Sequence, residues 1–238
     1  MVPDTLTCEL MSWGEFAVLA RTLAIRIKQS GFRPDLVIAI GRGGYVPARV
    51  VCDFLLHDML TSVKVEHWGM AAEEKPSVNV RFPLAVDITG KTVLVIDDVT
   101  DSGKTMEAAT SYLYSLHPRE IRTAVLQHKV FSSFRPDYFA REEKDWRWII
   151  YPWAVHEDIV GFVIKILAVT SLNEKGIMQQ FEERYRISVP LPDIRDALDD
   201  LLDMKRISCS GNRYSLRGNP VTRPPVSPAI PGQAPGRR

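Results

Sequence analysis

Residues 93–105 read Val-Leu-Val-Ile-Asp-Asp-Val-Thr-Asp-Ser-Gly-Lys-Thr, and this stretch decides the fold class. The apolar run 92–96 is typical of a strand that is buried on both faces. We expect a loop from Asp97 to Gly103 and a helix over 104–116, which Pro118 prevents from extending. A buried strand followed by a loop and a helix is the repeating unit of a parallel sheet.

The same pattern occurs upstream. Residues 35–40 predict a second buried strand, which is followed by the glycine-rich loop Gly41-Arg-Gly-Gly44 and a helix over 46–56. A helix over 12–29 precedes them, and Ser12 with Glu15 has the spacing of a capping box. Further strands are expected at residues 63–67, 122–127 and 148–150. Strands that alternate with helices predict an α/β fold, a mostly parallel sheet flanked by helices, which binds ligands at the carboxyl ends of its strands.

The remaining residues predict three further features. The stretch 69–90 has little periodicity, and we interpret it as a hairpin-like flap beside the site. Residues 161–218 predict a small winged-helix-like domain, with helices at 162–169, 174–185 and 193–204 and a hairpin around Gly211-Asn212. Residues 219–238 are rich in proline and predict a disordered tail, which leaves 1–160 as the main domain.

Composition excludes several classes of protein. The chain has 238 residues, of which 45% are hydrophobic, and its formal net charge is +1. A near-neutral chain has no overall attraction for nucleic acid or an anionic membrane. Cys8, Cys52 and Cys209 are too far apart to predict a disulfide framework, so we expect reduced thiols in a cytoplasmic protein. The sequence has no apolar run of membrane-spanning length and no signal peptide pattern, so no membrane contact is expected.

The segment after the strand at 92–96 carries the candidate binding groups. The first amides of a helix lack internal partners and carry the positive end of the helix dipole, so they suit a phosphate. Gly103 permits close approach of the backbone, while Ser102 and Thr105 add hydroxyl donors. Asp97 and Asp98 would repel a phosphate and suit the vicinal hydroxyls of a ribose instead. Carboxylates beside a phosphorylated sugar also attract a divalent cation.

These motifs also have simpler interpretations. A nucleoside-triphosphate loop is excluded, because Asp98 stands where that motif requires glycine. Acidic and small residues also form turns and helix caps, but three aspartates after a fully apolar strand are costly for capping alone. The loop 41–44 exposes amides and the multi-donor cation of Arg42 toward an anion, and a strained tight turn is the alternative explanation of its glycines.

Residues 96–105 resemble the phosphoribosyl-pyrophosphate motif of type I phosphoribosyltransferases, and the resemblance covers about residues 12–156. Residues 39–48, 127–129 and 148–153 are similar to segments of the 6-oxopurine members. The resemblance implies that the 5′-phosphate is bound by Thr100, Asp101, Ser102, Gly103, Lys104 and Thr105. It implies that Asp97 and Asp98 hold the ribose hydroxyls and, through them, Mg²⁺ indirectly. Arg42 and Gly43 would bind the pyrophosphate, often beside a non-proline cis peptide.

The resemblance also implies a base-binding end. Lys129 would donate to the 6-oxo group, Trp148 would stack on the base, and the backbone of Ile149 would bond to its edge. Without the resemblance, a lysine that ends a strand is usually solvated and an aromatic cluster is usually core. The xanthine-guanine pattern has an acidic residue where this chain has Ile150. Whether Glu157 or Asp158 substitutes for it stays open, as does the choice among hypoxanthine, guanine and xanthine.

The implied function is that of a purine salvage enzyme in nucleotide metabolism. It is a glycosyltransferase, more narrowly a pentosyltransferase, that joins a 6-oxopurine to phosphoribosyl pyrophosphate and releases pyrophosphate. By resemblance, Asp101 is the catalytic general acid/base that handles the N7 proton of the purine. The resemblance further implies Mg²⁺ as cofactor and a homodimer.

Two rival functions remain. A transcription regulator that senses phosphoribosyl pyrophosphate or a purine would use the winged-helix-like domain to bind DNA. The predicted helix over 193–204 is rich in aspartate, which disfavours DNA, while Arg206, Arg213 and Arg217 of the hairpin leave some room for it. An enzyme for adenine, orotate or uracil is the other rival, and Lys129 together with the aromatic segment favours 6-oxopurines.

Overall fold

The computed structural model describes residues 6–68 and 74–218, with 66–68 and 74–79 described by their backbone alone. The predicted disordered tail, 219–238, and residues 69–73 of the expected flap lie outside the described residues. Within this described part, no helix combines the length and the apolar character needed to cross a bilayer.

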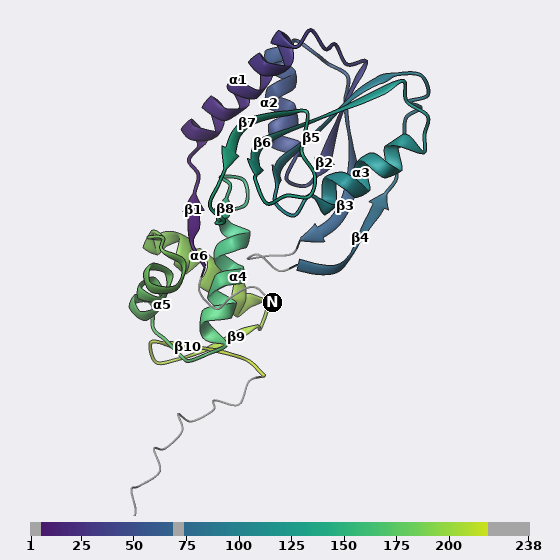
Figure 1. Cartoon of the computed structure of the whole chain (residues 1–238). Helices are drawn as coiled ribbons and strands as arrows, with labels where there is room; N and C mark the ends of the chain where they lie inside the picture. The colour runs from purple at the N-terminus through teal and green to yellow at the C-terminus, as the bar shows by residue number, and fades with distance from the viewer. Residues whose placement is uncertain (1–5, 69–73, 219–238) are drawn as a thin grey trace, which may run out of the picture.

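A six-stranded sheet forms the centre of the molecule (Figure 1). Its strands, in spatial order, are β4 (Glu74–Phe82), β3 (Leu60–Trp68), β2 (Leu36–Gly41), β5 (Thr92–Thr100), β6 (Glu120–Lys129) and β7 (Tyr138–Glu143). Neighbouring strands are parallel except for β3 and β4, which form an antiparallel pair. The predicted fold class, a mostly parallel sheet flanked by helices, is confirmed.

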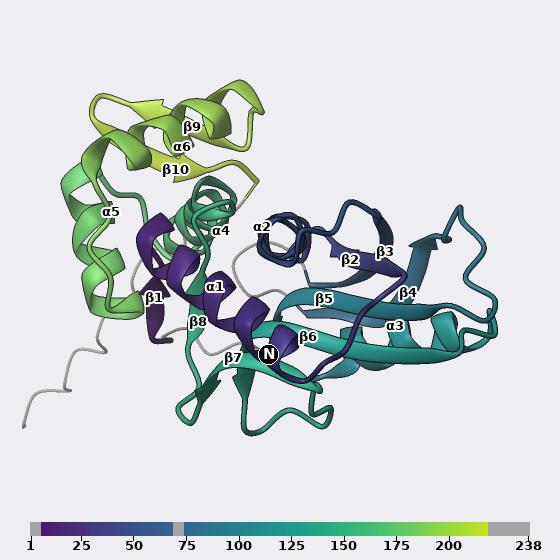
Figure 2. The same ribbon diagram turned by 90° about the horizontal axis from the view of Figure 1, so that it is seen from above.

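Helices cover both faces of this sheet. Helices α1 (Trp13–Gln29) and α2 (Tyr45–Leu55) lie on one face, and α3 (Lys104–Tyr114) lies on the other (Figure 2). Because successive side chains of a strand point to opposite faces, alternate residues of β2 enter different cores. Val37 and Ala39 pack with α1 and α2, while Ile38 and Ile40 pack on the side of α3. Burial on both faces explains the continuous apolar run.

Helix α1 begins where its capping signal predicts. The Ser12 hydroxyl accepts from the Glu15 amide at 3.2 Å, and the Glu15 carboxylate accepts from the Ser12 amide at 2.8 Å. These reciprocal bonds satisfy two amide donors that lack partners inside the helix. The predicted capping box is therefore confirmed.

Strand β5 is longer than its apolar run. We expected a loop from Asp97, but residues 97–100 continue the strand, so that part of the prediction was wrong. Asp97 pairs with Val125 and Thr100 pairs with His128 in the ladder with β6. Backbone pairing with a neighbouring strand thus overrides the low strand propensity of aspartate. The acidic residues sit on a rigid strand rather than in a loop.

Three strands were not predicted, and one predicted strand lies elsewhere. Strands β4 and β7 extend the main sheet at its two edges, and β4 with β3 forms a hairpin in the region of the expected flap. Strand β8 (Trp148–Ile150) is outside the main sheet: it pairs in parallel with β1 (Cys8–Leu10). The start of the chain therefore supports the segment that carries Trp148.

The C-terminal part has the predicted order of helices followed by a hairpin. It comprises α4 (Val155–Leu167), α5 (Glu174–Gln180) continued by a π-helix (Phe181–Tyr185), α6 (Leu191–Asp203), β9 (Ile207–Ser210) and β10 (Arg213–Leu216). The hairpin turns at Gly211, whose φ is +62°. Helix α4 continues through the expected boundary at residue 160. Residues of α4, α5 and α6 share a core with Cys8 and Ile150, so β1 and β8 connect the two parts.

Candidate active site

A cavity of about 760 Å³ opens at the carboxyl ends of β2, β5 and β6. It is lined by all but one of the residues that the sequence selects: Arg42, Gly43, Asp97, Asp98, Thr100, Asp101, Ser102, Gly103, Thr105, Lys129, Trp148 and Ile149. Lys104 is the exception, because its exposed side chain does not line the cavity. Motifs that are far apart in the sequence thus meet at the edge where parallel sheets bind ligands.

The turn into α3 is shaped to receive an anion. Gly103 has a φ of +89°, and a Cβ added there would lie 2.6 Å from the amide nitrogen of Phe134, so both conformation and space require glycine. Among the described residues, no side chain caps α3 at this point. Its first amides can therefore serve a phosphate. The Thr100 hydroxyl, beside this turn, lies 2.8 Å from Nδ1 of the buried His128.

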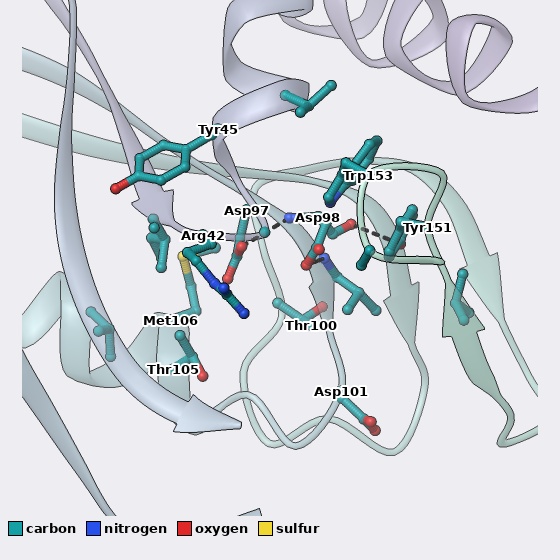
Figure 3. Close-up of a pocket in the computed structure, with 18 of the residues that line it drawn as sticks. Arg42, Tyr45, Asp97, Asp98, Thr100, Asp101, Thr105, Met106, Tyr151 and Trp153 are labelled. Atoms are coloured by element: carbon teal, nitrogen blue, oxygen red, sulfur yellow. Dashed lines mark hydrogen bonds between the residues drawn. The ribbon is translucent and has the colours of Figure 1, made fainter. Parts of the chain in front are cut away.

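Asp97 and Asp98 line the cavity at the end of β5, as Figure 3 shows. Burial raises the pKa of Asp97 well above its ordinary value, and the neighbouring Asp98 carboxylate raises it further. Burial also raises the pKa of Asp98 to about 6, although the Val99 amide donates to its carboxylate at 2.8 Å. Hydroxyl donors or a cation brought by a ligand would stabilise the ionised form of two such carboxylates.

The glycine-rich loop packs directly against these acids. A Cβ added to Gly43 would lie 2.3 Å from a carboxylate oxygen of Asp98, so only glycine allows the loop to approach β5 this closely. The peptide bond between Gly41 and Arg42 is cis, as the resemblance implies. Nη2 of Arg42 contacts both carboxylate oxygens of Glu157, at 2.6 Å and 2.5 Å.

Lys129 and Asp101 form an ion pair at the other end of the cavity. Nζ of Lys129 donates to Asp101 at 2.9 Å and to the carbonyl oxygen of Arg147 at 2.8 Å. The indole of Trp146 donates to the second carboxylate oxygen of Asp101 at 3.1 Å. Burial lowers the pKa of Lys129, while Asp101 opposes that shift. A lysine that ends a strand is usually solvated, and this one is buried and aimed at the cavity.

The aromatic segment after β7 divides between the cavity and the core. Trp148 lines the cavity, and its indole donates to Asp158 at 3.0 Å. Trp153 stacks on Tyr151 with ring centroids 4.8 Å apart and packs edge-on against Phe16 at 5.0 Å. Both Tyr151 and Trp153 also reach the cavity wall. The core interpretation therefore holds for Tyr151 and Trp153, which also line the cavity, while stacking of a base on Trp148 stays a prediction.

Sequence reasoning missed several residues of the cavity. Lys64 of β3 lines it and faces Asp97 closely enough to lower the pKa of that carboxyl against the effect of burial. Tyr45 lines it too, with its hydroxyl packed against Gly41. Glu157 and Asp158 both lie in the cavity wall. A single lysine in a half-buried strand gives no sequence signal, so only the spatial arrangement reveals Lys64.

Across the residues that the structure describes, no three His, Cys, Asp or Glu side chains form a metal-binding group. Asp97 and Asp98 nevertheless supply the oxygen donors that a hard divalent cation prefers. The indirect role of the two acids, through the ribose hydroxyls of a substrate, stays a prediction.

Comparison with known proteins is consistent with this geometry. A family model described as "Phosphoribosyl transferase domain" matches residues 8–158. A xanthine-guanine phosphoribosyltransferase from Cereibacter sphaeroides is 31% identical over 149 residues, which cover 60% of this chain and 84% of the relative. A hypoxanthine-guanine phosphoribosyltransferase from Saccharomyces cerevisiae is 30% identical over 122 residues, covering 44% of this chain and 54% of the relative.

Two solved structures are also similar to this chain. A purine phosphoribosyltransferase from Pyrococcus horikoshii superposes with a TM-score of 0.53 at 27% identity, covering 62% of this chain and 94% of that one. A protein from Neisseria gonorrhoeae with bound ppGpp superposes with a TM-score of 0.54 at 28% identity, covering 62% of this chain and 89% of that one. The family match ends in the first turn of α4, so most of the C-terminal part lies beyond it.

Proposed function

The chain belongs to the phosphoribosyltransferase family, and we propose from this premise that it joins hypoxanthine, guanine or xanthine to phosphoribosyl pyrophosphate. It is a purine salvage enzyme and a pentosyl-transferring glycosyltransferase. The choice of base rests on one observation above all. The buried ammonium of Lys129, an obligate hydrogen-bond donor, points into the cavity beside Asp101, where a 6-oxo group would accept from it.

Different parts of the cavity would bind different groups of the substrate. We assign the 5′-phosphate to the turn of residues 100–105, the ribose hydroxyls to Asp97 and Asp98, and the pyrophosphate to Arg42 and Gly43. Lys104 is exposed and does not line the cavity, so we assign only its backbone amide to the phosphate. Contacts at both ends of the sugar fix the reacting carbon relative to the base and so supply orientation.

The reaction breaks the bond between the anomeric carbon and pyrophosphate and forms a bond to a purine nitrogen. Such a centre passes through an oxocarbenium-like transition state. Arg42 stabilises the negative charge that grows on the leaving pyrophosphate. Asp101 holds or accepts the N7 proton of the purine. Lys129, whose Nζ lies 2.9 Å from Asp101, orients that carboxylate while it binds the 6-oxo group.

Magnesium fits this site. When bound, Mg²⁺ would neutralise charge on the pyrophosphate, and Asp97 with Asp98 would hold it indirectly, through the ribose hydroxyls. The β3–β4 hairpin rises beside the cavity, with Lys64 and Val65 in its wall. Closure of the flap over the reactants, which would exclude water, stays a prediction.

A panel of bases tests the proposal. The protein is incubated with phosphoribosyl pyrophosphate, magnesium and one base at a time, and pyrophosphate release is followed. We expect release with hypoxanthine, guanine or xanthine and none above background with adenine, orotate or uracil. Turnover confined to adenine or a pyrimidine would contradict the assignment to 6-oxopurines.

The regulator alternative gains no support from the described residues. Helix α6 presents exposed Asp196, Asp199 and Asp200, which would repel a DNA backbone. A gel-shift titration at low salt checks this, and we expect no tight, salt-sensitive binding. The division at residue 160, the homodimer and the cytoplasmic location stay predictions.

A further inference from the structure

The first turn of α4 contacts three different parts of the molecule through three consecutive residues. Nε2 of His156 lies 2.7 Å from Asp200 of α6. Glu157 pairs with Arg42 of the glycine-rich loop, and Asp158 accepts from the indole of Trp148. Glu157 and Asp158 therefore reach opposite ends of the cavity from adjacent positions, and the rest of α4 lies in the C-terminal part (Figure 1).

Glu157 places a negative charge where the pyrophosphate is assigned. Both of its carboxylate oxygens contact Nη2 of Arg42, at 2.6 Å and 2.5 Å, and Glu157 itself lines the cavity. The Arg42 side chain is 66% exposed, and partly exposed ion pairs contribute little to the orientation of a side chain. A carboxylate beside a bound polyanion, in contrast, repels it strongly where solvent is partly excluded. The repulsion between Glu157 and a bound diphosphate should therefore outweigh any benefit that Glu157 brings by orienting Arg42.

Asp158 acts at the other end. It is 5% exposed, and its Oδ2 accepts from Nε1 of Trp148 at 3.0 Å. Trp148 also packs against the core of the C-terminal part, which includes Ile159, Val160 and Phe162 of α4. A partly buried hydrogen bond on one edge of the indole and apolar packing on the ring together restrict its rotation. The plane on which a base would stack is thus set by α4.

We propose that the first turn of α4 determines how both substrates bind, with the C-terminal part serving as the support that holds this turn in place. Glu157 is a counter-ion that a diphosphate-bearing substrate must displace from Arg42, so it selects for ligands able to compete with a carboxylate. Asp158 is a positioning residue for Trp148 and sets the affinity for the base. This proposal rests on the proposed function, which assigns the pyrophosphate to the Arg42 end of the cavity and the base to the Trp148 end.

Calorimetry with inorganic pyrophosphate and magnesium tests Glu157. In Glu157→Gln, the amide keeps the size of the side chain and removes its charge, and we expect the Kd for pyrophosphate to fall by at least about threefold at low salt, with a smaller effect at high salt. Asp196→Asn, which removes a charge from the exposed face of α6, is the matched control and should leave the Kd unchanged. A Kd that is unchanged or raised in Glu157→Gln would overturn the role of Glu157.

Steady-state kinetics test Asp158 with two variants. Asp158→Ala removes the acceptor of the indole, and we expect the KM for the base to rise at least about fivefold while the KM for phosphoribosyl pyrophosphate changes less than about twofold. Asp158→Asn retains an oxygen acceptor and should restore most of the base affinity. A merely structural role would raise both KM values together, and that result, or an Asn variant as defective as the Ala variant, would overturn the role of Asp158.

The proposed function and the proposed role of the first turn of α4 can be contradicted by different results. A wild-type protein that converts no 6-oxopurine would defeat the proposed function. A wild-type protein that is active, with variants that do not show the selective changes above, would defeat this inference alone.

Discussion

Nζ of Lys129 lies 2.9 Å from a carboxylate oxygen of Asp101, and the lysine side chain is 2% exposed. Trp146 donates to the other oxygen of that carboxylate, and its ring lies 4.8 Å from the ammonium. The proposed N7 acid/base and the proposed ligand of the 6-oxo group therefore form one unit. Because the two atoms they would contact are neighbours on a purine, this spacing suits a single base lying across the pair.

Asp101→Asn should separate chemistry from binding. The amide still accepts from Lys129 but cannot take up a proton, so we expect turnover to fall at least tenfold. Loss of a general acid/base typically lowers the rate by about 10²–10⁴. The Kd for phosphoribosyl pyrophosphate, measured by calorimetry, should stay within about twofold. Asp145→Asn, at an exposed position nearby, is the control. Wild-type turnover in Asp101→Asn would remove Asp101 from this role.

Gly43→Ala should weaken binding of the diphosphate-bearing substrate and lower the stability of the fold. The new methyl would lie 2.3 Å from an Asp98 oxygen, so the loop or the acid must move. We expect the KM for phosphoribosyl pyrophosphate to rise at least about tenfold and the free energy of unfolding to fall by about 1–3 kcal/mol. In Gly14→Ala the nearest atom, Ser12 Oγ, would be 3.9 Å away, so the KM should be unchanged and the free energy of unfolding should not fall, because alanine is the better helix former. A Gly43→Ala enzyme with normal KM would show that the tight packing is dispensable.

Lys64→Met should weaken binding of the diphosphate substrate without loss of fold. Lys64 adds positive charge to a cavity that takes a polyanion, and its removal should raise the Kd about tenfold, which corresponds to about 1.4 kcal/mol. Calorimetry at two salt concentrations should also show a weaker salt dependence than in the wild type. Lys28→Met, on the exposed side of α1, controls for the change in net charge. Equal affinity in the wild type and Lys64→Met would exclude this contribution.

Glu143→Gln should reduce stability and flatten its dependence on acid. Burial by itself would raise the pKa of Glu143, but hydrogen bonds from Gln127, Arg147 and Arg141 outweigh it and hold the pKa below its ordinary value. A depressed carboxyl pKa stabilises the folded state above the unfolded pKa, and this stability is lost as the pH falls through the folded pKa.

We therefore expect Glu143→Gln to lose about 2 kcal/mol at pH 7, with a smaller difference from the wild type below about pH 4. Urea unfolding at both pH values measures this. Glu142→Gln, which breaks an exposed pair with Arg135, should change stability by less than about 1 kcal/mol. A constant difference between wild type and Glu143→Gln at all pH values would contradict the linkage.

The strands that the sequence predicts most clearly are those buried on both faces. The strands at 35–40 and 92–96 could be predicted because they are apolar on both faces, and the capping box marked the start of α1. Strand β7 could not, because its Tyr-Phe-Ala-Arg-Glu-Glu sequence belongs to a sheet edge where arginine and glutamate pair with each other. The end of β5 was missed because Asp97 and Asp98 indicate a loop unless the partner strand is known.

Predictability of the site depended on motifs. Residues in the three loops at the strand ends could be selected because their spacing has a chemical reason. Lys64 could not be selected, since a lone lysine on a strand is ordinarily solvated. Glu157 and Asp158 follow the aromatic segment, but only the direction of α4 decides that their side chains reach the cavity rather than solvent.

The pairing of β1 with β8 has a consequence for the order of assembly during protein synthesis. Cys8–Leu10 emerges from the ribosome early, yet its partner Trp148–Ile150 is made only after the whole central sheet. Contacts between distant segments form late, since a long loop must close first. A nascent chain halted before residue 148 would therefore carry the proposed phosphate-binding turn and the glycine-rich loop but not Trp148, the proposed platform for the base.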